Sequence, residues 1–280
     1  MKLPSLDTSA TAAWRPALRA LAERRSLILC YHGVAPSRAS EDPEFLRVDP
    51  ARFRAEVEML LEAGFEFLTV AGLAARAAGG PPPPGLAALS FDDGMDDNHA
   101  VVMPLLAEYG IPATVYVTTG MIGQPNPWIS ESARMMTREE LLELHAAGFE
   151  LGAHTVTHPD MSQLGREACA REIGESRALL EELTGTPVRT FAYPFCKYGP
   201  EALAAVEEAG FDAAVTCQGR GSWARYEMKR ALITGKDGLP SFVLKAWDAY
   251  GPLFHSPPGR AVRAGTRTAR RQVRALRERS

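Results

Sequence analysis

A local pattern that recurs along the chain constrains the fold more than any other feature of the sequence. A segment with helical character ends in a glycine, and an apolar residue follows at once. The four copies are Glu62-Ala63-Gly64-Phe65, Glu108-Tyr109-Gly110-Ile111, Ala146-Ala147-Gly148-Phe149 and Glu208-Ala209-Gly210-Phe211. Glycine favours the left-handed conformation that ends a helix, and the apolar residue then begins a strand. The recurrence predicts strands that alternate with helices, which is typical of a parallel sheet.

Short apolar segments between these glycines are the predicted strands. They are Leu27–Tyr31, Phe65–Val70, Leu86–Phe91, Ala113–Thr118, Phe149–Ala153, Arg189–Tyr193, Ala213–Thr216 and Lys229–Ile233. Segments with helical periodicity lie between them, for example Pro50–Ala63, Thr137–Ala147 and Arg166–Leu183. Seven or eight such units within 280 residues favour a single barrel over an open sheet.

We expect one compact domain with an extension at each end. The extensions are an N-terminal helical segment over residues 1–25 and a Pro/Arg-rich basic tail over 251–280, and the barrel covers residues 26–250. The Gly- and Pro-rich run over 79–84 is predicted to be a loop inside the domain, because strands and helices resume on both sides of it.

Charge is distributed unevenly along the chain. The net charge is −3, but residues 260–280 hold eight arginines and one glutamate, so this tail carries +7 and the remainder −10. Such an acidic body argues against a nucleic-acid groove. The tail is either a solvated, frayed helix or a contact to an anionic lipid surface.

The cysteines and the N-terminal segment indicate a compartment. Cys30, Cys169, Cys196 and Cys217 form no Cys-x-x-Cys pair, which indicates neither a cysteine zinc site nor a disulfide framework and agrees with a reducing environment. Arginines interrupt the apolar residues near the N-terminus, and no segment has the roughly 20 apolar residues of a transmembrane helix. We therefore expect a cytoplasmic protein whose tail is a candidate for peripheral membrane contact. The sequence indicates no oligomeric state.

Polar side chains follow four of the predicted strands directly. In a β/α barrel the C-terminal ends of the strands share one rim, where the loops carry the chemistry. The residues at these ends are His32-Gly33, Asp92-Asp93-Gly94, His154-Thr155-Val156-Thr157-His158 and Pro194-Phe195.

His154 and His158 are near enough in sequence to bind one cation together. Pro159 disfavours a helix at the residue before it, so a tight loop is expected. For this motif alone, the alternative is two surface histidines that cap a turn.

Asp92 and Asp93 point to different sides, because side chains alternate along a strand. One carboxylate can therefore bind a metal beside the histidines while the other acts as a base. For this motif alone, the alternative is an Asp-Asp-Gly turn that caps the following helix.

Three segments together resemble the polysaccharide deacetylases with the NodB homology domain, carbohydrate esterase family four. They are Ser90-Phe91-Asp92-Asp93-Gly94, His154-Thr155-Val156-Thr157-His158 and Arg189-Thr190-Phe191-Ala192-Tyr193-Pro194-Phe195. The order and spacing match, and the resemblance covers roughly residues 26 to 235. It implies a distorted (β/α)7 barrel with a divalent metal ion, usually zinc. By the same resemblance Asp93, His154 and His158 are the metal ligands and Asp92 is the catalytic base.

The chain departs from this family pattern at two places. Many members carry an arginine at the position of Ala192 that orients the base, and the late leucine-x-histidine motif that usually supplies the general acid is absent from residues 230–234. Leu29-Cys30-Tyr31-His32-Gly33 resembles the N-terminal motif of the poly-N-acetylglucosamine deacetylase branch, as if the barrel were circularly permuted. His32 is then the general acid, and a core histidine bonded to a backbone carbonyl is the alternative. We expect His99, His145 and His255 to be structural.

The expected reaction is hydrolysis of an acetyl group from a sugar. A zinc ion with three protein ligands keeps one open position and can lower the pKa of bound water to about 7. Asp92 would take the water proton, the metal and the backbone N–H of Phe195 would hold the oxyanion, and His32 would protonate the leaving amine. Tyr193, Pro194 and Trp223 are the candidate substrate contacts, with Trp223 favoured among the aromatic residues because it lies in a Gly-rich polar loop.

We therefore expect a metal-dependent N-deacetylase that acts on N-acetylhexosamine units of a glycan or of its lipid-linked precursor. A sugar O-acetyl esterase would use the same residues and demand less of His32. A non-catalytic carbohydrate-binding barrel is a further alternative, suggested by the missing arginine at Ala192.

Overall fold

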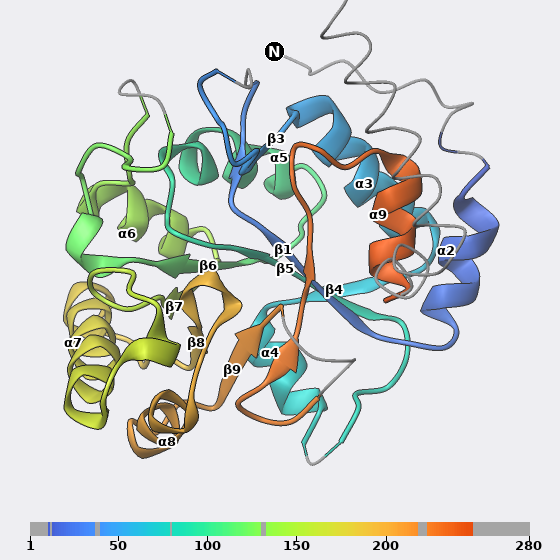
Figure 1. Ribbon diagram of the computed structural model, residues 1–280. Helices are drawn as coiled ribbons and strands as arrows, with labels where there is room; N and C mark the ends of the chain where they lie inside the picture. The colour runs from blue at the N-terminus through green and yellow to red at the C-terminus, as the bar shows by residue number, and fades with distance from the viewer. Residues whose placement is uncertain are drawn as a thin grey trace, which may run out of the picture.

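The computed structural model describes residues 11, 13–36, 40–78, 80–129, 133–217 and 223–248. Within them, a parallel sheet is nearly closed into a barrel and helices pack around it (Figure 1). The predicted distorted (β/α)7 barrel is confirmed. The predicted basic tail over 251–280, together with His255, lies outside the described residues.

The elements alternate along the chain as the glycine pattern predicts. The strands of the large sheet are β1 (Leu27–Tyr31), β4 (Glu66–Leu68), β5 (Leu86–Phe91), β6 (Thr114–Val117), β7 (Glu150–Ala153), β8 (Thr190–Ala192), β9 (Ala213–Thr216), β10 (Met228–Lys229) and β11 (Ala231–Leu232). A separate small sheet pairs β2 (Gly33–Val34) with β3 (Arg47–Val48). The α-helices are α2 (Arg15–Ala22), α3 (Pro50–Glu62), α4 (Val70–Arg76), α5 (Met103–Ala107), α6 (Arg138–Ala146), α7 (Arg166–Thr184), α8 (Pro200–Glu208) and α9 (Leu239–Ala246). Shorter turns are the π-helix η1 (Asn98–Val102) and the 3₁₀ turns η2 (Thr119–Met121), η3 (Met161–Gln163) and η4 (Pro194–Cys196).

Local sequence signals explain where the helices begin and end. The side chain of Asp49 accepts from the backbone N–H of Ala51 and caps α3, and Thr137 forms a capping box with Glu140 at the start of α6. The glycines of the recurring pattern have left-handed φ angles, for example 92° at Gly64. At this angle a residue with a Cβ atom would be strained, which explains why glycine recurs at the helix ends.

A single residue of the chain connects the two strands at the opposite edges of the large sheet. Strands run in the order β10-β9-β8-β7-β6-β5-β1-β11, and β4 pairs with β5 outside this path. In sequence, Arg230 alone separates β10 from β11. Because Met228 pairs with Val215 of β9 whereas Ala231 pairs with Leu29 of β1, the chain changes its partner at Arg230. We call residues 228–232 the seam of the barrel.

Side chains of β5 alternate between two apolar clusters. Leu89 and Phe91 belong to the large cluster beneath the helices, whereas Ala88 packs with Ile28 and Tyr116 in a smaller cluster formed mainly by strands. Ser90 and Asp92 continue the side of Ala88. The alternation therefore directs Asp92 to the interior side of the strand end.

Two details of the prediction need correction. The expected continuous strand over Lys229–Ile233 is two short strands, because the chain switches from β9 to β1 at Arg230. The small sheet of β2 and β3 was not predicted, since runs of two residues carry no periodicity. The N-terminal helical segment includes α2, whose Leu18 and Leu21 are buried in the main core. No helix among the described residues is long and apolar enough to cross a membrane.

Candidate metal and catalytic site

Asp93, His154 and His158 bring three metal-binding atoms together at the C-terminal rim of the sheet. Asp93 follows β5, and both histidines lie in the loop after β7. The Nε2 atoms of His154 and His158 are 3.5 Å and 3.4 Å from Oδ1 of Asp93. No other set of three or more Asp, Glu, His or Cys side chains in the described part of the chain brings its ligand atoms within 4.8 Å of one another.

These separations suit a shared cation better than direct hydrogen bonds. Ligand atoms about 2.0–2.1 Å from a tetrahedral zinc ion are about 3.3–3.4 Å apart, whereas 3.4–3.5 Å is long for an N–H···O bond. Oδ1 of Asp93 is buried and has no hydrogen-bond partner among the described residues. Nδ1 of His154 bonds the carbonyl oxygen of Ala192 at 2.8 Å, which fixes the ring with Nε2 toward Asp93. The residues present therefore fit a divalent metal ion.

The loop that carries the two histidines is held from helix α7. Oε2 of Glu172 accepts the backbone N–H groups of Val156 and Thr157 at 2.8 and 2.9 Å. Oγ1 of Thr155 accepts the backbone N–H of His158 at 3.0 Å. The φ angles of Thr155 and His158 are 67° and 60°, so this loop cannot be helical. The predicted tight loop is confirmed.

Arg230 of the seam pairs with Asp92. Its Nη1 and Nη2 atoms donate to Oδ1 and Oδ2 of Asp92 at 2.6 and 2.7 Å, and Nη1 also donates to Oγ of Ser90 at 3.1 Å. The Arg230 side chain is fully buried and that of Asp92 is 5% exposed. Burial raises the pKa of Asp92, but the positive charge and hydrogen bonds of Arg230 outweigh burial and hold this pKa well below its usual range. A guanidinium thus reaches Asp92 although position 192 is alanine.

The protonation of the three ligand residues is coupled. Burial raises the pKa of Asp93, but the adjacent His154 and His158 outweigh burial and lower it below its ordinary value. Burial lowers the pKa of His154, but the adjacent carboxylates of Asp93 and Asp92 raise it above its ordinary value. Burial and the neighbouring His154 lower the pKa of His158 to about 4. His158 is therefore neutral at pH 7, as a metal ligand must be.

His32 lies at the same rim, in the segment between β1 and β2. It is near enough to influence the pKa of both Asp92 and Asp93, so it lies close to the three candidate metal ligands. Its carbonyl oxygen accepts a hydrogen bond from Nδ2 of Asn98 at 2.9 Å, and its Nδ1 is buried without a partner among the described residues. A Cβ atom on Gly33 would lie 2.7 Å from Oδ2 of Asp97, so glycine is required beside His32.

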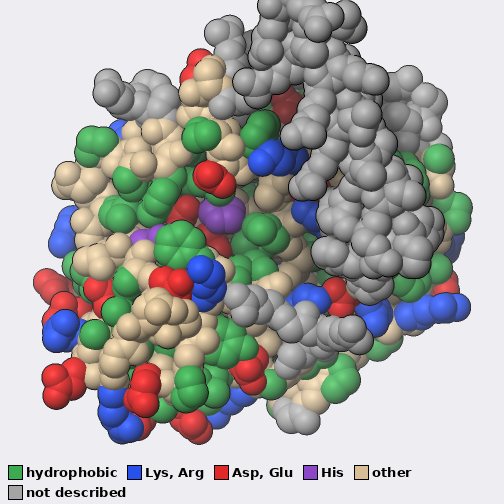
Figure 2. Space-filling view, in the orientation of Figure 1, with side chains coloured by type: hydrophobic (Ala, Val, Ile, Leu, Met, Phe, Trp, Pro, Cys, Tyr) green, Lys and Arg blue, Asp and Glu red, His purple; other side chains and the backbone are tan. Residues whose placement is uncertain are grey.

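Two aromatic side chains flank His158. The ring centroids of Trp128 and Phe195 are 4.7 and 4.6 Å from that of His158, both edge-on. Phe195 is 56% exposed and has a left-handed φ of 55°. Figure 2 shows histidine side chains near the centre of this face, with hydrophobic and acidic side chains around them. The three candidate metal ligands themselves are almost fully buried beside these aromatic side chains.

Comparison with known proteins gives the family. Residues 79–214 match the polysaccharide deacetylase family. The chain is 26% identical over 192 residues to a putative polysaccharide deacetylase of Bacillus subtilis. The aligned part is 68% of this chain and 64% of that protein, so the chain spans less than two thirds of this relative. It is 22% identical over 250 residues to the poly-beta-1,6-N-acetyl-D-glucosamine N-deacetylase of Staphylococcus aureus, over 81% of this chain and 84% of the relative. The IcaB structure from Ammonifex degensii superimposes with a TM-score of 0.69 at 25% identity, over 80% of this chain and 97% of that one.

Residues 79–214 are a polysaccharide deacetylase domain. The three motifs from which this domain was expected all lie within the matched residues, and the expectation is confirmed. The deacetylase of Streptococcus pyogenes solved with acetate has the same fold, with a TM-score of 0.68 at 24% identity over 79% of this chain and 97% of that one.

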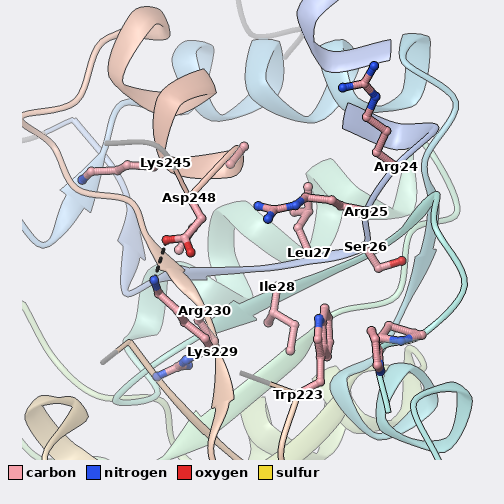
Figure 3. A pocket seen from close by; sticks show the side chains of 14 residues that line it. Arg24, Arg25, Ser26, Leu27, Ile28, Trp223, Lys229, Arg230, Lys245 and Asp248 are labelled. Atoms are coloured by element: carbon pink, nitrogen blue, oxygen red, sulfur yellow. Dashed lines mark hydrogen bonds and ion pairs between the residues drawn. The ribbon is translucent and has the colours of Figure 1, made fainter. Parts of the chain in front are cut away.

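Tyr193, Pro194 and Trp223 were expected to contact substrate. Tyr193 and Pro194 follow β8 at the C-terminal rim but are buried, and Trp223 lies away from this rim. Tyr193 is fully buried, and its hydroxyl donates to the carbonyl oxygen of Tyr226 at 3.1 Å. Pro194 is also buried. Trp223 lines a cavity of about 310 Å³ with the residues at the start of β1, at the opposite end of that strand from His32. Figure 3 shows its ring beside Ile28.

Sequence reasoning missed three residues that shape the candidate site. Arg230 lies in the predicted strand Lys229–Ile233, where the family pattern leads one to expect a histidine and gives no role to an arginine. Glu172 is one acidic residue among many on α7, and Trp128 follows a loop with no periodic pattern. A buried arginine in a strand is the one signal of the three that the sequence carried, because an arginine is almost never fully buried unless it is paired.

Proposed function

We propose that this polysaccharide deacetylase is a metal-dependent hydrolase that removes N-acetyl groups from N-acetylhexosamine units. The observation that carries the proposal is the division of labour between adjacent carboxylates. Asp93 faces the two histidines, whereas Asp92 is bound to Arg230. The named activity of the Staphylococcus aureus relative supports the amide as the bond that is cleaved.

A divalent metal ion held by Asp93, His154 and His158 would supply Lewis-acid activation of water and of the acetyl carbonyl. Asp92 takes the proton of the attacking water on its carboxylate. Because Arg230 occupies both oxygens in one plane, it fixes the orientation of this carboxylate and keeps it ionised. The backbone N–H of Phe195 stabilises the negative charge that develops on the carbonyl oxygen.

His32 donates the proton that an amide needs to leave as an amine. Asn98 anchors its backbone, so the ring is attached to a fixed point beside η1. The exposed ring of Phe195 and the half-buried ring of Trp128 border the cluster and provide apolar surface for a sugar ring. Phe195 therefore contributes both a backbone donor and a side-chain wall.

The missing arginine at Ala192 suggested a non-catalytic carbohydrate-binding barrel, and Arg230 removes that reason. The sugar O-acetyl esterase remains the competing activity, since it uses the same residues. A lipid-linked saccharide precursor is the form of the substrate that we propose, because the arginine-rich residues 260–280 suit an anionic membrane surface. This also fits the expected location at the inner face of the membrane.

One experiment tests the function. Purified protein is assayed for metal content and then for acetate release from oligosaccharides of N-acetylglucosamine and from O-acetylated sugars. We expect one divalent metal ion per chain, and acetate release from the N-acetylated substrates that stops when a chelator removes the metal. Release from the O-acetylated sugars alone would establish the esterase, and no release from any substrate by metal-loaded protein would contradict the proposal.

A further inference from the structure

The two histidines of the metal cluster are held in different ways. The backbone N–H of His154 donates to the carbonyl oxygen of Val117 at 3.1 Å, and its Nδ1 donates to that of Ala192 at 2.8 Å. Backbone and ring of His154 are thus both fixed by the strands on either side of β7. Nδ1 of His158, in contrast, is buried and has no hydrogen-bond partner among the described residues. The position of the His158 ring therefore depends on the loop that carries it and on the rings packed beside it.

The loop between the histidines has a backbone conformation that its surroundings must impose. Thr155 and His158 have left-handed φ angles of 67° and 60°, which residues with a Cβ atom adopt rarely. Threonine is branched at Cβ, so the angle is especially unfavourable at Thr155. Such residues keep a strained conformation only where neighbouring groups over-determine it. The contacts around this loop should therefore explain its shape.

Glu172 of α7 supplies three of these contacts. Its Oε2 accepts the backbone N–H groups of Val156 and Thr157 at 2.8 and 2.9 Å, and its Oε1 accepts the hydroxyl of Thr157 at 2.7 Å. Turn η2 holds the loop from another side, because the backbone N–H of Gly120 donates to the carbonyl oxygen of Val156 at 2.9 Å. The peptide group between Val156 and Thr157 is therefore bonded at both its carbonyl and its N–H.

Glu172 acts on the metal cluster through the backbone and not as a ligand. In the described part of the chain, the group of ligand atoms within 4.8 Å of one another consists of Asp93, His154 and His158. The hydrogen bonds of the Glu172 carboxylate go to the loop between the two histidines. A loop that is already in its binding conformation lowers the free-energy cost of binding, because the metal ion does not have to order it.

We propose that Glu172 is a positioning residue that holds His158 in place for a divalent metal ion through the backbone of the loop. This inference rests on the metal site of the proposed function. Without the three hydrogen bonds, Thr155 and His158 relax toward ordinary φ angles, and Nε2 of His158 moves away from Oδ1 of Asp93. Metal binding must then restore the strained loop, so the metal affinity falls. His154 keeps its place, because the neighbouring strands hold it.

Metal affinity measures this role without any substrate. Zinc dissociation constants of the full-length unchanged protein and of its variants are measured by competition with a chelator of known affinity. We expect Glu172→Ala to bind zinc about 10–100-fold more weakly, the usual effect of losing a group that supports metal ligands. The matched control is Glu175→Ala, which should bind zinc like the unchanged protein. Glu175 is exposed further along α7, and its side chain forms no hydrogen bond or ion pair with the described residues.

Two conservative variants separate the hydrogen bonds of Glu172 from its charge. Glu172→Gln removes the charge, but its amide oxygen can accept both backbone N–H groups and its amide nitrogen can donate to Oγ1 of Thr157. We therefore expect this variant to keep most of the zinc affinity. Glu172→Asp keeps the charge, but its side chain is one methylene shorter and cannot make all three bonds. We expect it to bind zinc more weakly than Glu172→Gln.

Two further measurements separate positioning from a general loss of structure. In thermal unfolding of the metal-free proteins, Glu172→Ala should unfold close to the temperature of Glu175→Ala, because relief of the strained φ angles offsets the lost bonds. Cobalt(II) then replaces zinc as a spectroscopic probe, since its visible absorption depends on the geometry of its ligands. We expect altered cobalt bands in Glu172→Ala and unaltered bands in Glu172→Gln.

Equal zinc affinities of the unchanged protein and Glu172→Ala would overturn the proposal. So would Glu172→Asp binding zinc more tightly than Glu172→Gln, because the effect would then belong to the charge. This comparison also decides the matter if Glu172→Ala does not fold. A metal-free Glu172→Ala that unfolds at a much lower temperature but has unaltered cobalt bands would reduce Glu172 to a structural role. Absence of zinc binding by the unchanged protein would instead refute the metal-dependent function itself, so the two failures are distinguishable.

Discussion

Arg230 is the residue that joins β10 to β11, and its guanidinium donates hydrogen bonds to both carboxylate oxygens of Asp92. The guanidinium lies 5.4 Å from the ring centroid of Tyr116, and Ser90 accepts one of its hydrogen bonds. A fully buried arginine is costly to desolvate unless its charge is paired. The pairing with Asp92 meets this requirement and at the same time prepares the carboxylate for proton transfer.

Replacing Arg230 should change the pH dependence of the reaction. Burial alone raises the pKa of Asp92, so Arg230→Met should move the acidic limb of the kcat/KM profile to higher pH and lower activity at neutral pH. Arg230→Lys keeps a charge and should shift the limb less. Loss of one partner of a buried pair typically costs about 3–5 kcal/mol, so both variants should be checked by thermal unfolding. A folded Met variant with an unchanged pH profile would contradict the role of Arg230.

The same pair predicts how stability depends on pH. The pKa of Asp92 is lower in the folded chain than its ordinary value of about 3.9. The stabilisation is therefore complete above that ordinary value and is lost as the pH falls toward the folded-state pKa. Urea unfolding of the unchanged protein and of Arg230→Met should show a difference at neutral pH that shrinks in acid.

Removing either histidine of the cluster should release the metal ion. His154→Ala and His158→Ala each remove one of the three protein ligands, and we expect both purified variants to contain far less metal than the unchanged protein. His99→Ala is the matched control. His99 is not part of the cluster, and its Nε2 lies 2.8 Å from Oε2 of Glu143. Metal analysis that finds full occupancy in both ligand variants would exclude this site.

The two aspartates should behave differently when each is changed to asparagine. Asp92→Asn should keep the metal ion and lose about 10²–10⁴-fold in kcat, the usual contribution of a general base. Asp93→Asn should weaken metal binding, measured by titration with a competing chelator. Equal effects of the two substitutions on metal content would show that the assigned roles are wrong.

His32→Ala should impair the cleavage of amides more than that of activated esters. An amide nitrogen must be protonated as it leaves, whereas an activated ester has a good leaving group. The comparison of kcat for an N-acetylated sugar and for a nitrophenyl acetate, at equal metal content, measures this selectivity. The control is His145→Ala, whose ring contacts Thr186 at the surface. An equal loss with both substrates would assign His32 to a role other than the general acid.

Much of this structure could be predicted because its signals are local. The ends of β1, β5 and β9 were predicted to the residue, since each is a short buried apolar run. The expectation that the polar strand ends share one rim followed from the barrel, and the ligand set Asp93, His154 and His158 followed from the family resemblance. The pairing of β1 with β11 makes the first and last strands of the barrel neighbours, as the predicted barrel requires.

The contacts that could not be predicted join distant parts of the chain. Arg230 is 138 positions from Asp92, and no spacing rule relates them. Trp223 was expected to contact substrate because its loop is polar, but Trp223 itself lies at the other end of the barrel. Tyr193 follows β8 at the correct rim, yet its side chain turns into the core. Sequence patterns place strand ends well, but the direction of each side chain depends on packing.

The pairing at the seam predicts that positions 92 and 230 evolve together. A substitution at position 230 that removes the guanidinium leaves the carboxylate of Asp92 without its partner. It also removes the side chain that holds the junction of β10 and β11 to β5, so one substitution affects both the site and the fold. A change at position 92 has the reciprocal effect, since it leaves the buried guanidinium of Arg230 without a partner inside the barrel. Among related chains that have alanine at position 192, these two positions should therefore be inherited as a unit.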